Sequence, residues 1–285
     1  MKITSTINQI KQLIYKTDKR PVGFVPTMGA LHNGHLTLVR SAVTQCPLVI
    51  VSIYVNPTQF NNKEDLRNYP RLLDKDLALL SKTLRAEDIV FTPDDKEMYP
   101  NKDIRIFSFG NLGKVMEAVH RPGHFNGVAQ IVSRFFDIID PDVAFFGLKD
   151  FQQVAIIKEL VRQMKYKVRI EANTTVREPD GLAMSSRNML LEPLDRKNAP
   201  VIFRTISEAT ALMKRTDIPE VKIYVRNNIE NKTGFRVEYF EIVDDIKLIP
   251  VNSKKQMKSG KRYYGCIAVW AGKIRLIDNI EFPLE

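Results

Sequence analysis

The sequence lacks most features of secreted or membrane-bound proteins. Only 2 cysteines occur among its 285 residues, too few for a disulfide framework, so we expect a reducing, cytoplasmic location. The longest apolar stretch, residues 48–55, contains a serine and is far shorter than the ~18 residues of a membrane span, so no membrane partner is expected. Residues 1–10 contain no apolar segment of the kind found in signal peptides.

The composition is that of a globular protein with a full core. Apolar residues make up 44% of the chain and charged residues 27%, which excludes disorder, collagen and coiled coil. A chain of 285 residues has room for two domains of roughly 100–200 residues each. The 43 basic and 33 acidic residues leave a formal charge of +10, which suggests an anionic partner: nucleic acid, an acidic membrane or a phosphorylated small molecule.

Two periodicities alternate along the first 175 or so residues. Short apolar and β-branched runs predict strands, and amphipathic spacings predict helices. The predicted strands are residues 22–25, 48–55, 88–91, 143–146 and 167–171, and the predicted helices are residues 35–46, 71–85, 127–139 and 152–164. This alternation indicates an α/β fold with a doubly wound parallel sheet, in which ligands bind at the carboxyl ends of the strands.

The pattern changes after residue 173, where a polar linker begins. The predicted elements beyond it are helices 193–214 and 219–231, followed by strands 235–243, 263–270 and 273–277. Helices followed by antiparallel strands indicate a separate, smaller α+β domain, so we divide the chain into residues 1–178 and 179–285. A cleft between the two domains would suit a substrate. The basic stretch 252–262 is interpreted as a solvated hairpin loop, with nucleic-acid contact the less favoured alternative.

The densest motif is the segment PTMGALHNGH at residues 26–35, between the first predicted strand and a helix. A helix N-terminus presents unpaired N–H groups and a partial positive charge to phosphate, and the two glycines allow close approach. His32 and His35 could donate hydrogen bonds to phosphate oxygens as negative charge grows on them. Two alternatives are a pair of surface histidines and a zinc site completed by His120 and His124, although no cysteine lies near either pair.

Two further motifs follow predicted strands. Asn56 and Gln59 come directly after the central strand, where neutral amides can hold hydroxyl or carboxylate groups. An ordinary Asn-Pro turn is the alternative, favoured when this motif is taken alone. After the strand at 143–146, Lys149 supplies a point charge for phosphate, and Asp150 is either a helix cap or a contact to ribose or metal.

The linker itself carries hydroxyl and guanidinium groups in tandem. Ser185, Ser186 and Arg187 can wrap the outer phosphates of a nucleotide, and a mobile segment that does so excludes water from a reactive intermediate. The alternative is a solvated polar linker, but this interpretation agrees less well with the apolar residues 182–184. The sequence RPGHF at residues 121–125 is either a second anion contact or a structural turn.

Together these segments resemble the pantothenate synthetases, the pantoate–β-alanine ligase family of the HxGH nucleotidyltransferase-like superfamily. The resemblance rests on PTMGALHNGH (26–35), NPTQF (56–60), RPGHF (121–125), FGLKDFQQ (146–153) and VREPDGLAMSSRN (176–188). The HxGH pattern alone recurs in other nucleotidyltransferases and in aminoacyl-tRNA synthetases, but the five segments in this order are specific. A weaker match, IRLIDN at residues 274–279, has Ile274 where threonine is expected.

The resemblance implies a Rossmann-like, Mg²⁺-dependent homodimer that acts in the pathway to coenzyme A and has no nucleic-acid partner. In this family the carboxylate of pantoate attacks the α-phosphorus of ATP, which releases pyrophosphate and leaves pantoyl adenylate. The amine of β-alanine then displaces AMP. Residues 1–178 would bind ATP and pantoate, and residues 179–285 would form a lid.

The resemblance also assigns roles to single residues. The catalytic groups would be His35, as proton donor, with His32 beside it, and Lys149. The ATP site would comprise Pro26, Thr27, Met28, Gly29, Ala30, Leu31, His32, Asn33, Gly34, His35, Gly147, Leu148, Lys149, Asp150, Val176, Met184, Ser185, Ser186 and Arg187. Gln59 and Gln153 would hold pantoate, and Gln59 would also border β-alanine. The ligands of Mg²⁺ are not assigned.

The chemistry of His35 and two other functions stay open at this point. We favour hydrogen-bond donation by His35 over proton transfer, because pyrophosphate is a good leaving group that barely needs protonation. The residues alone also allow transfer of a nucleotide onto a phosphate, or tRNA binding. The ~110 residues after the linker leave little room for an anticodon-reading domain. A plain binding module has no need of three phosphate-facing segments.

Overall fold

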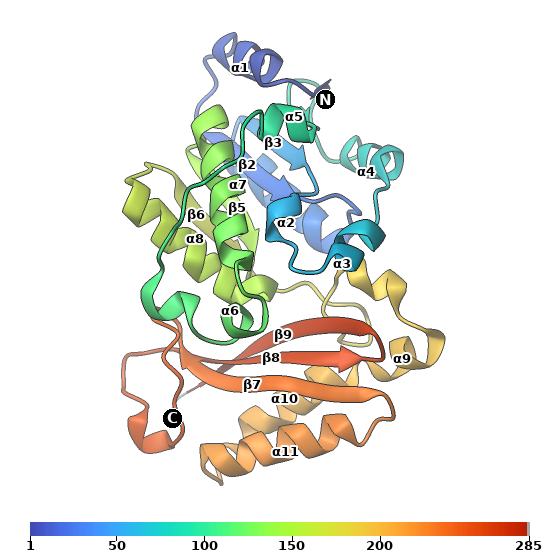
Figure 1. The fold of residues 1–285 in the computed structure, drawn as a ribbon, viewed down its shortest axis with the longest axis vertical. Coiled ribbons are helices and arrows are strands. Elements are labelled where there is room, and N and C mark those ends of the chain that lie inside the picture. The colour runs from blue at the N-terminus through green and yellow to red at the C-terminus, as the bar shows by residue number, and fades with distance from the viewer. Residues whose placement is uncertain (284–285) are drawn as a thin grey trace.

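The computed structural model describes residues 1–283, which form a parallel sheet and a smaller antiparallel sheet, both covered by helices (Figure 1). The strands are β1 (Lys2–Thr4), β2 (Val22–Thr27), β3 (Leu48–Ile53), β4 (Ile89–Phe91), β5 (Val143–Gly147), β6 (Arg169–Asn173), β7 (Phe235–Asp244), β8 (Tyr263–Ala271) and β9 (Ile274–Phe282). The helices are α1 (Ile7–Tyr15), α2 (Asn33–Gln45), α3 (Lys63–Asn68), α4 (Leu73–Leu80), α5 (Asp95–Met98), α6 (Glu117–His120), α7 (His124–Ile139), α8 (Phe151–Met164), α9 (Pro193–Asn198), α10 (Val201–Leu212) and α11 (Ile218–Glu230). Short 3₁₀ helices are η1 (Pro57–Gln59), η2 (Gly110–Gly113), η3 (Leu148–Asp150), η4 (Ser186–Leu190) and η5 (Lys254–Gln256).

The six-stranded sheet is parallel throughout and has the order β1-β4-β3-β2-β5-β6. From β2 the chain runs outward through β3 and β4 on one side, and β5 and β6 extend the sheet on the other. The winding direction therefore reverses between β2 and β5, which confirms the predicted doubly wound fold. In such sheets the crevice outside the carboxyl ends of the two strands at the reversal is the usual ligand site.

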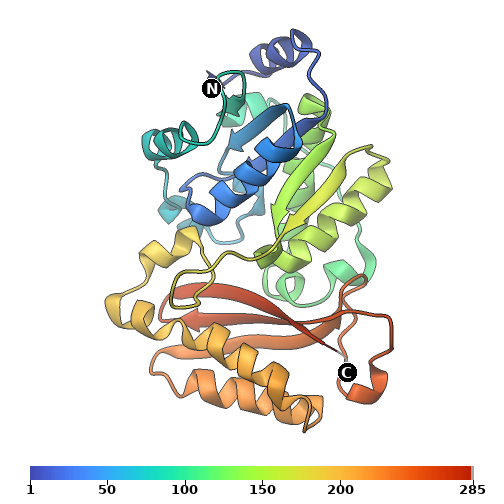
Figure 2. The same cartoon turned by 180° about the vertical axis from the view of Figure 1, so that it is seen from behind.

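Alternate residues of the central strands point to opposite faces of the parallel sheet. Val25 and Val51 pack with α2 and α4 on one face, and Phe24 and Ile50 pack with α1, α7 and α8 on the other. Figures 1 and 2, which view the molecule from opposite sides, show these two helical layers. Burial on both faces explains why β3 reads as an uninterrupted apolar run. None of the helices within residues 1–283 has the length and apolar character needed to cross a bilayer.

The antiparallel sheet β7-β8-β9 lies between α10 and α11 on one side and the parallel-sheet domain on the other (Figure 1). Ile242 and Ile267 face the helices, whereas Tyr239, Val243 and Tyr264 join the core of the first domain. The basic stretch 252–262 lies in the loop that connects β7 to β8, as predicted. The division of the chain at residues 178 and 179 stays a prediction; it lies in the linker between β6 and α9.

Two predicted helices differ from those observed. The helix predicted over residues 71–85 is shorter, since α4 ends at Leu80 and the main chain turns toward Asp88, whose carboxylate accepts a hydrogen bond from the Arg85 N–H at 2.8 Å. The single helix predicted over residues 193–214 is two helices, α9 and α10. Pro200 separates them because it has no N–H to donate to the carbonyl oxygen of the preceding turn.

The remaining differences are elements that were not predicted and shifts at the ends of elements. No element was predicted for residues 2–15, where β1 pairs with β4 at the sheet edge and α1 buries Ile10, nor for the short helices α3, α5 and α6. Strand β6 begins and ends two residues later than predicted, and β9 extends to Phe282 rather than residue 277. Helices α2 and α7 begin earlier than predicted, so both polar motifs at their N-termini belong to the helices.

Candidate active site

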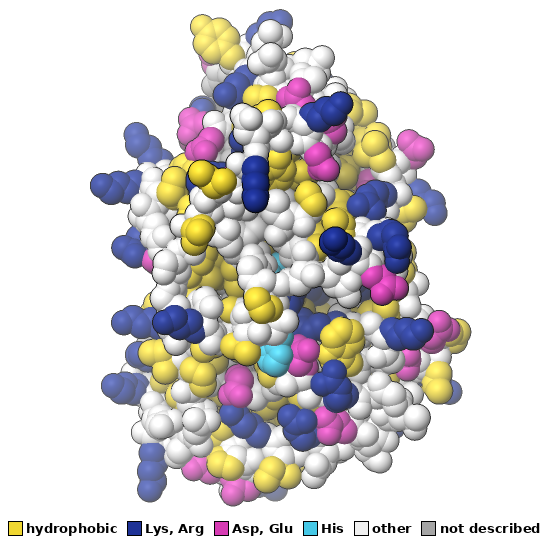
Figure 3. Space-filling view, viewed as in Figure 1, with side chains coloured by type: hydrophobic (Ala, Val, Ile, Leu, Met, Phe, Trp, Pro, Cys, Tyr) yellow, Lys and Arg dark blue, Asp and Glu magenta, His cyan; other side chains and the backbone are white. Residues whose placement is uncertain are grey.

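Two adjoining cavities open at the carboxyl ends of β2 and β5. The smaller has a volume of about 230 Å³, and the larger, between the two domains, about 1000 Å³. Both are lined by Arg121, Lys149, Asp150, Ser185 and Arg187. At the junction of the domains, side chains of both charge signs and a histidine reach the surface (Figure 3). The basic side chains on this face are spread out rather than gathered in one patch.

Most of the residues predicted for the site line the smaller cavity. They are Pro26, Thr27, Met28, His32, Gly34, His35, Gln59, Gly147, Lys149, Asp150, Gln153, Val176, Met184, Ser185, Ser186 and Arg187. Gly29, Ala30, Leu31, Asn33 and Leu148 are not in its lining. Ala30 and Leu31 are buried behind it, so these residues support the wall of the cavity instead of facing into it.

The loop after β2 is held by a carboxylate that the sequence analysis missed. Gly29 and Ala30 both have left-handed backbones, with φ of 78° and 49°. Buried Asp76 on α4 accepts hydrogen bonds from the N–H of Ala30 at 2.9 Å and of Leu31 at 2.7 Å. Burial raises the pKa of Asp76, and these two donors oppose the rise. One sequence signal could have found it: Asp76 lies on the leucine-bearing, buried face of its helix.

His32 and His35 form a reciprocal cap at the N-terminus of α2. The Nδ1 atom of His32 accepts a hydrogen bond from the Gly34 N–H at 3.1 Å, and Nδ1 of His35 accepts from the His32 N–H at 3.3 Å. The ring centroids are 4.1 Å apart. Because Nδ1 is the acceptor in both rings, each neutral imidazole carries its proton on Nε2, which leaves two N–H donors beside the helix terminus.

Burial keeps this histidine pair neutral. It lowers the pKa of His32 to about 4, with a further contribution from the charge of Lys149. Burial also lowers the pKa of His35 well below its usual value, with the neighbouring His32 and Lys149 adding to the effect. Both side chains are therefore uncharged hydrogen-bond donors near neutral pH in the nucleotide-free protein.

Neutral buried histidines predict a pH dependence of stability. The folded-state pKa of His32 is about 4, whereas histidine in an unfolded chain titrates near 6.5. The unfolded state thus binds more protons between these values. We expect the free energy of unfolding to rise with pH by about 1 kcal/mol per unit for this imidazole up to about pH 6.5, then to level off. Urea unfolding of wild type and His32→Gln tests this: the slope should be shallower in the variant, and equal slopes would contradict it.

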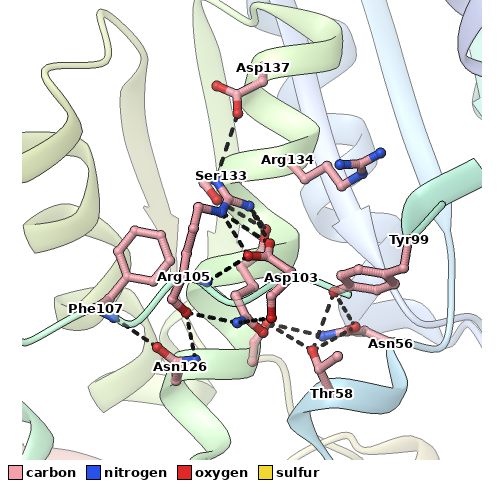
Figure 4. A network of polar contacts seen from close by, with 12 residues as sticks. Asn56, Thr58, Tyr99, Asp103, Arg105, Phe107, Asn126, Ser133, Arg134 and Asp137 are labelled. Atoms are coloured by element: carbon pink, nitrogen blue, oxygen red, sulfur yellow. Dashed lines mark hydrogen bonds and ion pairs between the residues drawn. The ribbon is translucent and has the colours of Figure 1, made fainter. Parts of the chain in front are cut away.

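The polar atoms of Asn56 are all engaged within the protein, so this residue positions others. Its Nδ2 donates to Gln59 Oε1 at 3.0 Å and to the carbonyl oxygen of Gly127 at 3.1 Å. Its Oδ1 accepts from the Tyr99 hydroxyl at 2.8 Å (Figure 4). The Gln59 Nε2 donates to the sulfur of Met28 at 3.0 Å. Gln59 therefore faces the cavity in a set orientation, supported by a buried amide.

The RPGHF motif forms a turn that places a cation at the site, and the anion contact considered for it stays a prediction. The Nδ1–H of buried His124 donates to the carbonyl oxygen of Gln59 at 2.8 Å, and its Nε2 accepts from Arg121 Nη1 at 3.2 Å. Burial lowers the pKa of His124 to about 4. This neutral imidazole fixes the main chain at Gln59 and holds the guanidinium of Arg121 where the two cavities meet.

Lys149 lies in the cavities beside Asp150, at 3.2 Å from its Oδ1 atom. Asp150 occupies the N-cap position of α8, as one of its two interpretations predicted, but its side chain makes no capping hydrogen bond. The loop is braced from the other domain: Asn279 Nδ2 on β9 donates to the carbonyl oxygens of Leu148 at 2.8 Å and Lys149 at 3.0 Å. The IRLIDN segment thus contributes through a main-chain contact across about 130 residues, which local spacing could not reveal.

The linker is fastened to both domains. Ser186 Oγ donates to the carbonyl oxygen of Ala30 at 3.0 Å, which holds the linker against the loop after β2. Arg177 makes a bidentate ion pair with buried Asp278 at 2.6 and 3.0 Å. Arg187 pairs with Asp65 of α3 at 2.9 Å. Two of the three contacts are ion pairs of linker arginines, so the segment is not a freely solvated connection.

The histidines are not arranged as a zinc site. His32 and His35 use their Nδ1 atoms to accept main-chain N–H groups, and His124 uses both ring nitrogens. Within residues 1–283 no three His, Cys, Asp or Glu side chains cluster as metal ligands would. The zinc interpretation is therefore unsupported.

Comparison with known proteins identifies the relatives of this fold and site. A sequence model described as pantoate–β-alanine ligase matches residues 2–281. The chain is 47% identical to the pantothenate synthetase of Azobacteroides pseudotrichonymphae, over 99% of this chain and 100% of that protein. The crystal structure of pantothenate synthetase from Thermus thermophilus superposes with a TM-score of 0.90 at 38% identity, covering 99% and 100% of the two chains. Pantoate–β-alanine ligase from Francisella tularensis, solved with an ATP compound and β-alanine, matches with a TM-score of 0.79 at 33% identity, covering 98% and 97%.

Proposed function

The chain belongs to the pantoate–β-alanine ligase family and forms pantothenate, and we propose that it does so through a pantoyl-adenylate intermediate. The pantoate carboxylate would attack the α-phosphorus of ATP, forming a P–O bond as pyrophosphate leaves. The β-alanine amine would then attack the acyl carbon, and AMP would depart. The observation that carries this proposal is the pair of Nε2–H donors of His32 and His35 at a helix N-terminus, in one cavity with Lys149.

The proposed position of the ATP phosphates follows from the donors and charges in the cavity. The N-terminus of α2 and the two imidazole N–H groups favour negative charge as it develops at phosphorus. Lys149 and Arg187 add cations where the two cavities meet. Arg187 would exchange the Asp65 carboxylate for a phosphate oxygen, so residues 184–187 would settle over the nucleotide after it binds.

Pantoate would occupy the smaller cavity beside its apolar wall. Pantoate carries two methyl groups as well as hydroxyl and carboxylate groups, so it needs both apolar and polar contacts. Val128 and Val132 of α7 supply the apolar surface, and Gln59 and Gln153 supply amides. The combination of an apolar wall with a few placed polar groups is typical of small-molecule sites.

β-Alanine would enter where the two cavities meet. Its carboxylate requires a cation, and Arg121, held by His124, lines both cavities close to the Gln59 turn. A guanidinium can bind a carboxylate through two parallel hydrogen bonds. The amine of β-alanine would then face the acyl adenylate held by Gln59.

Mg²⁺ would enter as the counter-ion of ATP. The ion prefers oxygen ligands and keeps several waters, using one or two carboxylates together with phosphates. The residues of the site fit this mode: Asp150, whose side chain is 45% exposed, offers a carboxylate beside Lys149. Asp150 would hold the ion, which would neutralise phosphate charge when bound.

The homodimer implied by the family and the cytoplasmic location predicted from the low cysteine content belong to the same proposal. Cys46 and Cys266 are both free and buried, in keeping with a reducing compartment.

Exchange of labelled pyrophosphate into ATP tests the adenylate. We expect exchange with pantoate present and β-alanine absent, because the first step alone is reversible. Addition of β-alanine should divert the adenylate to pantothenate and AMP. Exchange that needs an amino acid instead of pantoate, or pantothenate formation with ADP as the product, would overturn the proposal.

A further inference from the structure

A buried group of charged side chains joins the two domains beside Arg121, and the reaction proposed above uses none of them. Glu117 of α6 belongs to the first domain, whereas Glu238 of β7 and Arg275 of β9 belong to the second. Their side chains are 8%, 14% and 15% exposed and line the larger cavity. Figure 1 shows α6 at the junction, next to the antiparallel sheet. Burial of charged groups is costly unless they are paired, so the pattern of pairing is informative.

The guanidinium of Arg275 is fully engaged by the two carboxylates. Its Nη1 and Nη2 atoms donate to Oε2 and Oε1 of Glu117 at 2.8 and 2.7 Å, which makes a bidentate pair across the domains. Its Nε and Nη2 atoms donate to Oε2 of Glu238 at 2.8 and 2.6 Å. The Oε1 atom of Glu117 also accepts from the hydroxyl of buried Tyr239 at 2.7 Å. All three nitrogens of Arg275 thus serve the two carboxylates, and both oxygens of Glu117 are occupied.

Arg121 lies one helical turn after Glu117, and no carboxylate within residues 1–283 forms a hydrogen bond with its side chain. Its Nη1 atom is 3.8 Å from Glu117 Oε2, beyond hydrogen-bonding distance, and donates instead to the neutral ring of His124. Burial lowers the pKa of Arg121, and the charge of Glu117 only partly opposes this effect. A partly buried guanidinium whose charge is not fully compensated favours an anionic ligand.

We propose that Arg275 is a positioning residue for the second step: it holds Glu117 away from Arg121, and so keeps that guanidinium available to the carboxylate of β-alanine. This inference rests on the β-alanine site proposed above. Without Arg275, the Oε2 atom of Glu117 would need to move by about 1 Å to form a hydrogen bond with Arg121. A carboxylate of the protein would then compete with the carboxylate of the substrate for one guanidinium.

The position of these side chains predicts an effect on one of the two steps. The smaller cavity, to which we assign pantoate and the phosphate donors, is lined by Arg121 but by neither Arg275 nor Glu117. Formation of the adenylate, measured by pantoate-dependent pyrophosphate exchange, should therefore not depend on Arg275. Its influence reaches the reaction through Arg121, and thus through the binding of β-alanine.

Steady-state kinetics of three variants test this role. Arg275→Met should raise the KM for β-alanine about 10- to 100-fold, the range expected for loss of hydrogen bonds to a charged group, with no change in pyrophosphate exchange. Glu117→Gln should not raise that KM, because the competing charge is gone. Glu117→Gln/Arg275→Met should return the KM toward the wild-type value for the same reason. The matched control is Arg262→Met, which breaks an exposed ion pair with Glu281 of β9 and should alter neither measurement.

Four outcomes would overturn the proposal: a wild-type KM in Arg275→Met, a raised KM in Glu117→Gln, a double variant no better than Arg275→Met, or loss of pyrophosphate exchange in folded Arg275→Met. The last would indicate a general loss of the site in place of competition at Arg121. Glu117→Gln keeps the test decisive even where Arg275→Met fails to fold, because its amide oxygen can still accept from Tyr239 and Arg275.

Arg121→Gln separates this proposal from the β-alanine site on which it rests. A wild-type KM for β-alanine in Arg121→Gln would overturn the site itself, and with it the role of Arg275. A raised KM in Arg121→Gln beside a wild-type KM in Arg275→Met would overturn the role of Arg275 alone.

Discussion

We expect His35→Ala to lower the rate of pantoate-dependent pyrophosphate exchange about 10²- to 10³-fold. His35→Asn should keep part of the activity that the alanine variant loses. The imidazole of His35 is uncharged, because burial, then His32 and then Lys149 lower its pKa. With Nδ1 accepting the His32 N–H, the proton on Nε2 is the group available to a phosphate oxygen. An asparagine amide also offers an N–H donor, whereas alanine offers none.

The contrast between the two variants separates hydrogen-bond donation from proton transfer. Asparagine can donate a hydrogen bond but cannot give up a proton, so equal collapse of both variants with the fold intact would contradict donation. The control is Thr44→Ala near the far end of the same helix, an exposed residue whose hydroxyl only bonds the carbonyl oxygen of Ser41. It should leave the exchange rate unchanged.

Features that depend on neighbours in sequence were predicted well. The apolar run of β3, buried on both faces, predicts a central parallel strand, and the sheet order confirms it. The placement of His32 and His35 at a helix start follows from the turn-rich residues before it, and that placement creates the donor pair. Lys149 lies in the cavity because the carboxyl ends of β2 and β5 meet at the reversal of the sheet.

Features that depend on long-range contacts were not predicted. Asp76 holds a loop 45 and 46 residues away, and Asn279 holds the Lys149 loop from another domain. Asp76 accepts from main-chain N–H groups and Asn279 donates to main-chain carbonyl oxygens. Because every residue except proline has both main-chain groups, such contacts leave no pattern in the sequence of the loop that is held. Asn56 lies at the edge of the sheet where ligands bind, as predicted, but its side-chain amide forms hydrogen bonds with Gln59, Tyr99 and Gly127. Counting hydrogen-bond partners, which requires coordinates, distinguishes such a support from a binding group.

Gly127→Ala is expected to displace the main chain at Gln59 and so to lower activity, although Gly127 does not line the smaller cavity. A Cβ atom built at this position would lie 2.3 Å from the carbonyl oxygen of Thr58 and 2.7 Å from the main-chain nitrogen of Gln59. Both are backbone atoms, so a side-chain rotation cannot relieve the clash, and η1 must move away from α7. Displacement by about 1 Å can cost about 10²-fold in rate, and overpacking of this kind costs about 1–3 kcal/mol of stability.

The expected signature is a raised KM for pantoate together with a lower exchange rate, because Gln59 moves with η1. The bonds from Asn56 Nδ2 to Gly127 and from His124 to Gln59 span the same interface and would be strained at the same time. Gly113→Ala is the matched control: its added Cβ would meet only Phe109, at an ordinary 3.8 Å. Since Gln130 of the same helix is bonded to the carbonyl oxygens of Asp103 and Arg105, α7 should not yield in place of η1. A Gly127→Ala enzyme with unchanged affinity for pantoate would contradict this prediction. It would mean that η1 keeps its place or that Gln59 does not hold pantoate.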